Sequence, residues 1–192
     1  MAYPTVSAPY GFKPINSVDG KPYAGATRQY AIEGTDNIFY GDLVKLVQGE
    51  VLPFDGTDSG FPLGVFVGAQ YTNSMGQTIQ GQYYPSGSAN GIAYVVVDSQ
   101  AAYQVAVTDS GSVVDDATTI AAIGANMEVV LGTGDATTGN SGMSVLVGSE
   151  TDAAAFPIRV VDVVPATQTA TGYPELVVKI NVTQFDRATG VV

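Results

Sequence analysis

The chain has 192 residues and a mass of 19.8 kDa, which favours one domain, or one domain with an arm. It has no histidine and no cysteine, so it lacks the commonest general base, metal ligand and soft nucleophile. Its 18 acidic and 7 basic residues give a net charge of −11, which disfavours binding to nucleic acid. We therefore predict a protein that holds other molecules, with no catalysis, no cofactor and no metal.

The first 25 residues are predicted to form an extended arm ahead of a β-rich body over residues 26–192. Prolines favour extended backbone, and they recur here at Pro4, Pro9, Pro14 and Pro22. The apolar anchors along the arm are Tyr3, Tyr10, Phe12 and Ile15. A frayed terminus is the alternative. Three aromatic side chains are unusual in a tail that meets only solvent, so we expect the arm to dock on a neighbouring surface.

The rest of the chain has the composition of a β protein. Valine outnumbers leucine by 27 to 7, and β-branched side chains fit a pleated surface. With 23 glycines and 10 prolines between apolar runs, we predict an antiparallel β-barrel or sandwich of about ten short strands and one short helix. The predicted strands cover residues 28–32, 42–47, 51–54, 63–71, 78–84, 92–97, 103–108, 127–131, 143–147, 158–164 and 176–185.

Local signals set the limits of these elements. Turns are predicted at Gly49-Glu50, Asp55-Gly56 and Asn90-Gly91. Residues 92–97 are apolar on both faces, so this strand is expected to be buried on both sides. The helix is predicted over residues 115–124, with Asp115 or Asp116 at its start and Gly124 at its end. No run of about 18 apolar residues or signal segment is found, so no membrane partner is expected.

A long window of the sequence carries no charge. No charged residue lies between Asp58 and Asp98. The aromatic residues inside this window are Phe61, Phe66, Tyr71, Tyr83, Tyr84 and Tyr94. A central core accounts for part of the window. The remainder is expected at a surface that another copy or another protein covers, because interface centres are poor in charge and rich in tyrosine.

Motifs that would carry chemistry are incomplete. Residues 134–141 have the spacing of a phosphate loop, but Asn140 stands where the lysine must be, and Asp135 would repel phosphate. Paired carboxylates could hydrolyse glycosides, yet Asp115-Asp116 fit a helix cap better. Asp109 together with Asp115 could ligate a stray cation, although no complete calcium loop is present.

A series of short segments, in the same order along almost the whole chain, resembles a family of tailed-phage structural proteins that look like head decoration, or cement, proteins. The segments are residues 7–15, 28–30, 41–46, 62–68 with Tyr71, 83–85, 93–98, and 177–181 near 188–191. Two departures are visible. Tyr84 stands where relatives carry tryptophan, and Val182-Thr183 stand where some relatives carry a histidine.

The resemblance implies a non-catalytic protein on the outer surface of the phage head. Such proteins tie neighbouring subunits of the major capsid protein together, often as trimers. The residues expected to contact the capsid or a neighbouring copy are Tyr3, Pro9, Tyr10, Phe12, Pro14, Ile15, Tyr83 and Tyr84. Removal of residues 1–15 is then expected to leave a folded protein that no longer binds heads.

Other functions stay open at this point. The chain could be another virion part, such as a tail, neck or minor capsid protein. From a different class, it could be a carbohydrate-binding adhesion domain in which exposed Tyr83 and Tyr84 form a platform for sugar. A hydrolase that uses only aspartate and glutamate is the remaining alternative.

Overall fold

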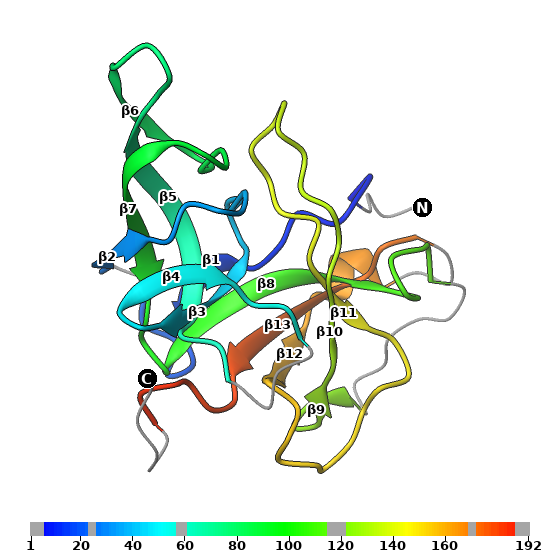
Figure 1. Cartoon of the computed structure of the whole chain (residues 1–192). Helices are drawn as coiled ribbons and strands as arrows, with labels where there is room; N and C mark the ends of the chain where they lie inside the picture. Colours follow the sequence, from blue (N-terminus) through cyan, green and yellow to red (C-terminus); the bar gives the residue numbers. More distant parts are fainter. Residues whose placement is uncertain (1–5, 23–25, 57–60, 115–121, 169–171, 187–192) are drawn as a thin grey trace.

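The computed structural model describes residues 6–22, 26–56, 61–114, 122–168 and 172–186. Within these residues the chain is mainly β, as predicted, and its strands form two sheets (Figure 1). Each sheet curls into a barrel, and the two barrels lie side by side. We name them the first and the second barrel.

The first barrel is a six-stranded sheet with the order β3-β4-β2-β7-β5-β6. An additional pairing between β3 and β5 closes the ring and leaves β6 outside it as an edge strand. Its strands are β2 (Arg28–Ile32), β3 (Leu43–Val47), β4 (Glu50–Pro53), β5 (Gly64–Thr72), β6 (Thr78–Gly81) and β7 (Ala89–Val96).

The second barrel is a seven-stranded sheet with the order β10-β11-β8-β13-β12-β9, to which β1 is added along β8. Its strands are β1 (Lys13–Ser17), β8 (Ala101–Thr108), β9 (Asn126–Met127), β10 (Val129–Val130), β11 (Ser144–Leu146), β12 (Ile158–Val163) and β13 (Glu175–Ile180). A short 3-10 helix, η2 (Pro165–Thr167), precedes β13. Glu128 alone separates β9 from β10, so one segment joins the two ends of the sheet and nearly closes it.

The two barrels share a packed boundary made by strands that are buried on both faces. The side chains of Val44, Phe66 and Val95 point into the first barrel, and their neighbours Leu43, Val65 and Val96 pack in the core of the second. Successive side chains of a strand point to opposite faces, so apolar runs are what such strands require. The prediction that residues 92–97 are buried on both sides is confirmed for Val95 and Val96.

Several predicted boundaries differ from the structure. Asn90-Gly91 is not a turn, because both residues lie inside β7, where the pairing with β5 is irregular. The predicted strand 127–131 is two strands, divided at Glu128 because β9 pairs with β12 and β10 with β11. The last strand ends at Ile180, after which the Asn181 amide donates to Pro157. Most of the predicted helix, residues 115–121, lies outside the described residues.

The described part of the predicted arm packs on its own chain. It is extended, and β1 pairs antiparallel with β8. Phe12 is 0% exposed and belongs to the core of the second barrel. The Gly11 amide donates to Met143 O, and the Phe12 amide donates to Gly41 O. Contrary to the expectation from sequence, removal of residues 1–15 should therefore destabilise the fold, because it empties the position of Phe12 in the core.

The first prediction is that the buried Phe12 side chain stabilises the fold. Phe12→Ala should lower the free energy of unfolding by about 3–5 kcal/mol, the usual cost of truncating a buried phenylalanine. Urea denaturation followed by circular dichroism measures it. Lys13→Ala, at the neighbouring exposed residue of β1, is the matched control and should unfold with the wild type. Equal midpoints for Phe12→Ala and wild type would show that the segment does not contribute to the stability of the body.

Candidate functional site

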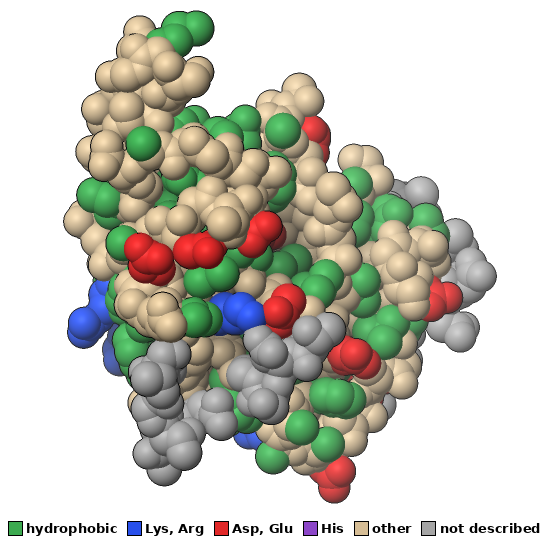
Figure 2. Space-filling view, viewed as in Figure 1, with side chains coloured by type: hydrophobic (Ala, Val, Ile, Leu, Met, Phe, Trp, Pro, Cys, Tyr) green, Lys and Arg blue, Asp and Glu red, His purple; other side chains and the backbone are tan. Residues whose placement is uncertain are grey.

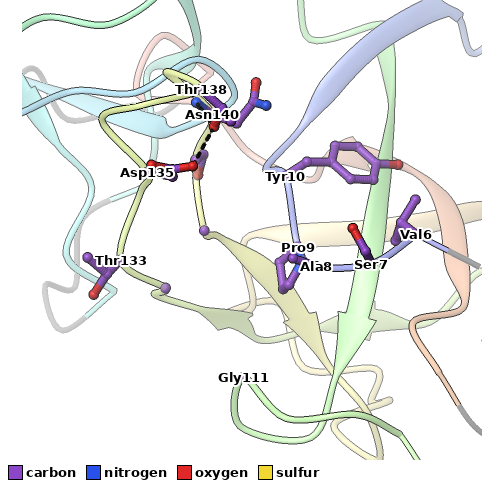
Figure 3. A pocket seen from close by; sticks show the side chains of 13 residues that line it. Val6, Ser7, Ala8, Pro9, Tyr10, Gly111, Thr133, Asp135, Thr138 and Asn140 are labelled. Atoms are coloured by element: carbon purple, nitrogen blue, oxygen red, sulfur yellow. Dashed lines mark hydrogen bonds between the residues drawn. The ribbon is translucent and has the colours of Figure 1, made fainter.

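One hollow that the described residues line has a volume of about 690 Å³. It lies between the N-terminal segment, residues 6–10, and the long loop 131–143 that joins β10 to β11 (Figure 3). In Figure 3, Asp135, Thr138 and Asn140 stand on the loop side of the hollow, and Val6 to Tyr10 form the facing side. Most of its lining is backbone and small or polar side chains.

Close backbone approaches set the shape of the 131–143 loop. A Cβ on Gly132 would lie 1.9 Å from Gly142 O, and one on Gly134 would lie 2.2 Å from the ring of Phe39. The two sides of the loop can approach this closely only because Gly132 has no side chain, and Gly134 lets the loop pack directly on Phe39. The loop is therefore held against the first barrel.

Asp135 organises the tip of the same loop. Its carboxylate accepts hydrogen bonds from the Thr137 amide, at 2.8 Å, and from the Thr138 hydroxyl, at 3.0 Å. These bonds, the amide first, hold the pKa of Asp135 below its usual value. The spacing that resembles a phosphate loop thus builds a closed turn, with a carboxylate where a phosphate would need to sit.

A partly buried hydrogen-bond cluster fastens the N-terminal segment. The Tyr10 hydroxyl donates to the carboxylate of Glu175, which also accepts a bond from Gln104 Nε2 at 2.8 Å. Burial, followed by the contact with Glu175, raises the pKa of the Tyr10 hydroxyl, so it stays protonated. The polar end of Tyr10 is therefore used within the chain, and its ring forms part of the surface.

Asp42 marks the point where three segments meet. The carboxylate is buried and accepts a hydrogen bond from the Phe39 amide at 2.7 Å, and Ser141 of the 131–143 loop bonds to it as well. On the N-terminal segment, a Cβ on Gly11 would lie 2.5 Å from the Cβ of Ser141. Burial raises the pKa of Asp42 to about 6, and the two hydrogen bonds lower it in part.

The residues predicted to contact other molecules are placed in different environments. Pro9, Tyr10, Pro14, Ile15 and Tyr83 are half-buried, Phe12 and Tyr84 are buried, and Tyr3 lies outside the described residues. The structure brings Pro9 and Tyr10 together at the hollow. It places Tyr83 near the same loop, since a Cβ on Gly139 would lie 3.6 Å from the Tyr83 ring.

Tyr83 and Tyr84 do not form one exposed platform. Tyr83 stacks on Phe39, with ring centroids 5.5 Å apart and planes 9° apart. Tyr84 lies inside the first barrel, edge-on to Tyr71, and its hydroxyl donates to Ser88 O at 2.5 Å. Because neighbouring side chains of an extended chain point to opposite faces, the pair is divided between surface and core.

A projection without charge rises above the first barrel. It belongs to residues 69–92, from the end of β5 through β6 to the start of β7 (Figure 1), which lie within the uncharged window. Ala69, Tyr71 and Tyr84 at its base pack in the core of the first barrel, and the turn between β5 and β6 extends beyond it. Figure 2 shows this part free of acidic and basic side chains, with hydrophobic atoms at its end. Met75 at the tip is 82% exposed. The turn is held by Asn73 Oδ1, which accepts bonds from the amides of Met75, at 3.0 Å, and Gln77, at 2.9 Å.

Comparison of the chain with protein-family models, with curated proteins and with solved structures finds no match. Over the described residues, no group of three or more aspartates and glutamates is placed to hold a metal ion. In the same part of the chain, no helix has the length and apolar character to cross a membrane.

Sequence reasoning missed Asp42 and Glu175 as organising residues. Each is a carboxylate at or just before the start of an apolar strand, and each is buried. The sequence offers a weak signal, because charged residues are rare in this chain and these two directly precede strand residues. Ser141, which bonds to Asp42, and Tyr10 and Gln104, which bond to Glu175, lie far along the chain and cannot be identified from local pattern.

The second prediction follows from the burial of Asp42. Between its usual pKa of 3.8 and about 6, the folded protein keeps a proton that the unfolded chain releases. Stability should therefore fall as pH rises through this window, by about 1.4 kcal/mol per pH unit. Asp42→Asn replaces the titratable carboxyl group with an amide that does not titrate. The amide oxygen can still accept the hydrogen bond from the Phe39 amide.

Urea denaturation of both proteins between about pH 4 and pH 7 measures this effect. The variant should become progressively more stable than wild type up to about pH 6, and the difference should stay constant above it. Asp152→Asn, at an exposed position, should run parallel to wild type. A constant difference between Asp42→Asn and wild type across the range would contradict the prediction.

Proposed function

We propose that the chain is a capsid decoration protein of a tailed phage. In this role it is a non-catalytic cement that binds the outer surface of the head and ties neighbouring subunits of the major capsid protein together. The ordered series of segments described above supports this class of protein, and two barrels joined by a packed boundary suit a part that must carry load. We infer a homo-oligomer, with a trimer favoured.

The observation that carries this proposal is the uncharged projection. Its methionine belongs to neither core and is exposed at the tip, where its side chain is available to pack against another molecule. The absence of charge across residues 69–92 fits the centre of a protein interface. We therefore propose that this projection makes the main capsid contact, in place of the N-terminal arm expected from the sequence.

Binding through such a projection would be weak for a single copy. An oligomer presents several projections at once, so the later contacts form at high effective concentration and the whole assembly binds tightly. The net charge of −11 would keep free copies apart before they reach the head. These two effects together favour attachment to a lattice over association in solution.

The third prediction tests the projection on phage heads that lack this protein. Purified wild type should bind such heads at regular lattice positions, seen by cryo-EM, and in the many copies of a decoration protein. Met75→Glu should reduce binding strongly, because it buries an unpaired charge at the interface. Val113→Glu, at another exposed apolar position that is 42% exposed and follows β8, should bind like wild type.

Two outcomes would reject the proposal. One is failure of the wild-type protein to bind heads at all. The other is a location in the tail or neck, in few copies per particle. Wild-type occupancy by Met75→Glu would retain the head location but remove the projection as the contact.

A further inference from the structure

A second hollowed region runs over the outer face of the first barrel, beside the N-terminal segment. It consists of two adjoining hollows of about 500 and 320 Å³, which share Val67 and Gln82 in their walls. We name it the tyrosine–amide groove, after the residues Tyr10, Tyr40, Tyr94, Gln80, Gln82 and Asn140. It is separate from the exposed tip of the projection.

A β-bulge and two glycines keep the floor of this groove open. Phe66 pairs with Val95 and Gly68 pairs with Tyr94, so Val67 is an extra residue in β5. Gly68 has a φ of +147°, and a Cβ there would lie 3.1 Å from Gly81 O. With no side chain at Gly68 or Gly81, the ring of Tyr94 borders open space. Bulges often occur next to functional sites, where they redirect a side chain.

The amides in the groove are held in place and retain bonding capacity. Gln82 Nε2 donates to Asn140 Oδ1 at 2.8 Å, which links the residue directly after β6 to the 131–143 loop. Among the described residues, Gln82 Oε1 and Asn140 Nδ2 have no further partner, and neither do the hydroxyls of Tyr40 and Tyr94. Burial raises the pKa of Tyr40, so its hydroxyl remains a neutral donor and acceptor.

The residues that line the tyrosine–amide groove favour one class of ligand. The lining has no carboxylate and one cation, Lys13, at one end, so it gives little attraction to a highly charged ligand. A purely apolar ligand would leave the amides and hydroxyls without partners, which is costly. A sugar chain satisfies both kinds of surface, because its C–H faces pack on aromatic rings and its hydroxyls bond to amides.

We propose that the tyrosine–amide groove binds a neutral oligosaccharide, with Tyr94 as the stacking ring and Gln82 and Asn140 as the hydrogen-bonding pair. The groove is open, so a single site should bind weakly, and an assembly with many copies would gain avidity. This site uses other residues than the Tyr83 and Tyr84 platform considered from sequence. The proposal does not rest on the function in phage heads.

The fourth prediction is tested with the purified full-length chain. Two-dimensional NMR titrations use maltohexaose, cellohexaose and chitohexaose, with a heparin hexasaccharide as the charged comparison. Ligand is raised to about 10 mM, which detects binding free energies down to about 3 kcal/mol. At least one neutral hexasaccharide should bind, with shifts at Tyr94 and Gln82, and heparin should not.

Variants separate a binding role from a structural one. Tyr94→Ala should weaken binding at least about tenfold, or about 1.4 kcal/mol. Tyr94→Phe keeps the ring and should retain most of the affinity. Gln82→Ala should weaken binding as well, and Gln100→Ala, at an exposed glutamine before β8, should have no effect. Thermal unfolding shows whether each variant is folded. If Tyr94→Ala is unfolded, the affinities of Gln82→Ala and Tyr94→Phe decide whether the groove binds the sugar.

Three results would overturn the proposal. They are no binding of any neutral hexasaccharide, unchanged affinity in both Gln82→Ala and a folded Tyr94→Ala, or tighter binding of heparin than of every neutral chain. None of these depends on whether the protein binds phage heads.

Discussion

The two-sided burial of β3, β5 and β7 at Leu43-Val44, Val65-Phe66 and Val95-Val96 is the constraint on which the other parts of the structure depend. Leu43, Val65 and Val96 pack in the second core, so a rotation of one barrel relative to the other would disrupt close packing. That fixed boundary lets the N-terminal segment and the 131–143 loop bridge the barrels and meet at Asp42. The tyrosine–amide groove begins where the outer face of β5 and β7 emerges from this boundary.

Much of the β architecture could be predicted from sequence because strands have a short period. The strand at residues 28–32 has the predicted bounds, and the two-sided burial predicted for residues 92–97 is confirmed at Val95 and Val96, where the apolar pattern requires it. The turn predicted at Asn90-Gly91 was wrong because pairing with β5 overrides the favourable local turn signal. The docking of β1 could not be predicted, because its partner β8 lies far along the chain and no local signal identifies that pairing.

The surface residues were harder to predict than the fold. Tyr83 and Tyr84 are adjacent in sequence, and alternation alone implies that they face opposite ways. Which of the two is buried depends on the β-bridge between Ile38 and Tyr84, which is a tertiary contact. Tyr94 shares a strand face with Val96, yet Val96 is buried and Tyr94 is half-exposed. The sequence does not show where along β7 the cover of the second barrel ends.

The order of the strands along the chain determines when each barrel can form during synthesis. All strands of the first barrel lie between Arg28 and Val96, in one continuous stretch, whereas the second barrel takes β1 from before that stretch and β8 to β13 from after it. The first barrel is thus an insertion within the second. On the ribosome its ring can close as soon as β7 emerges, while β1 waits for β8, and the second sheet is complete only after Ile180.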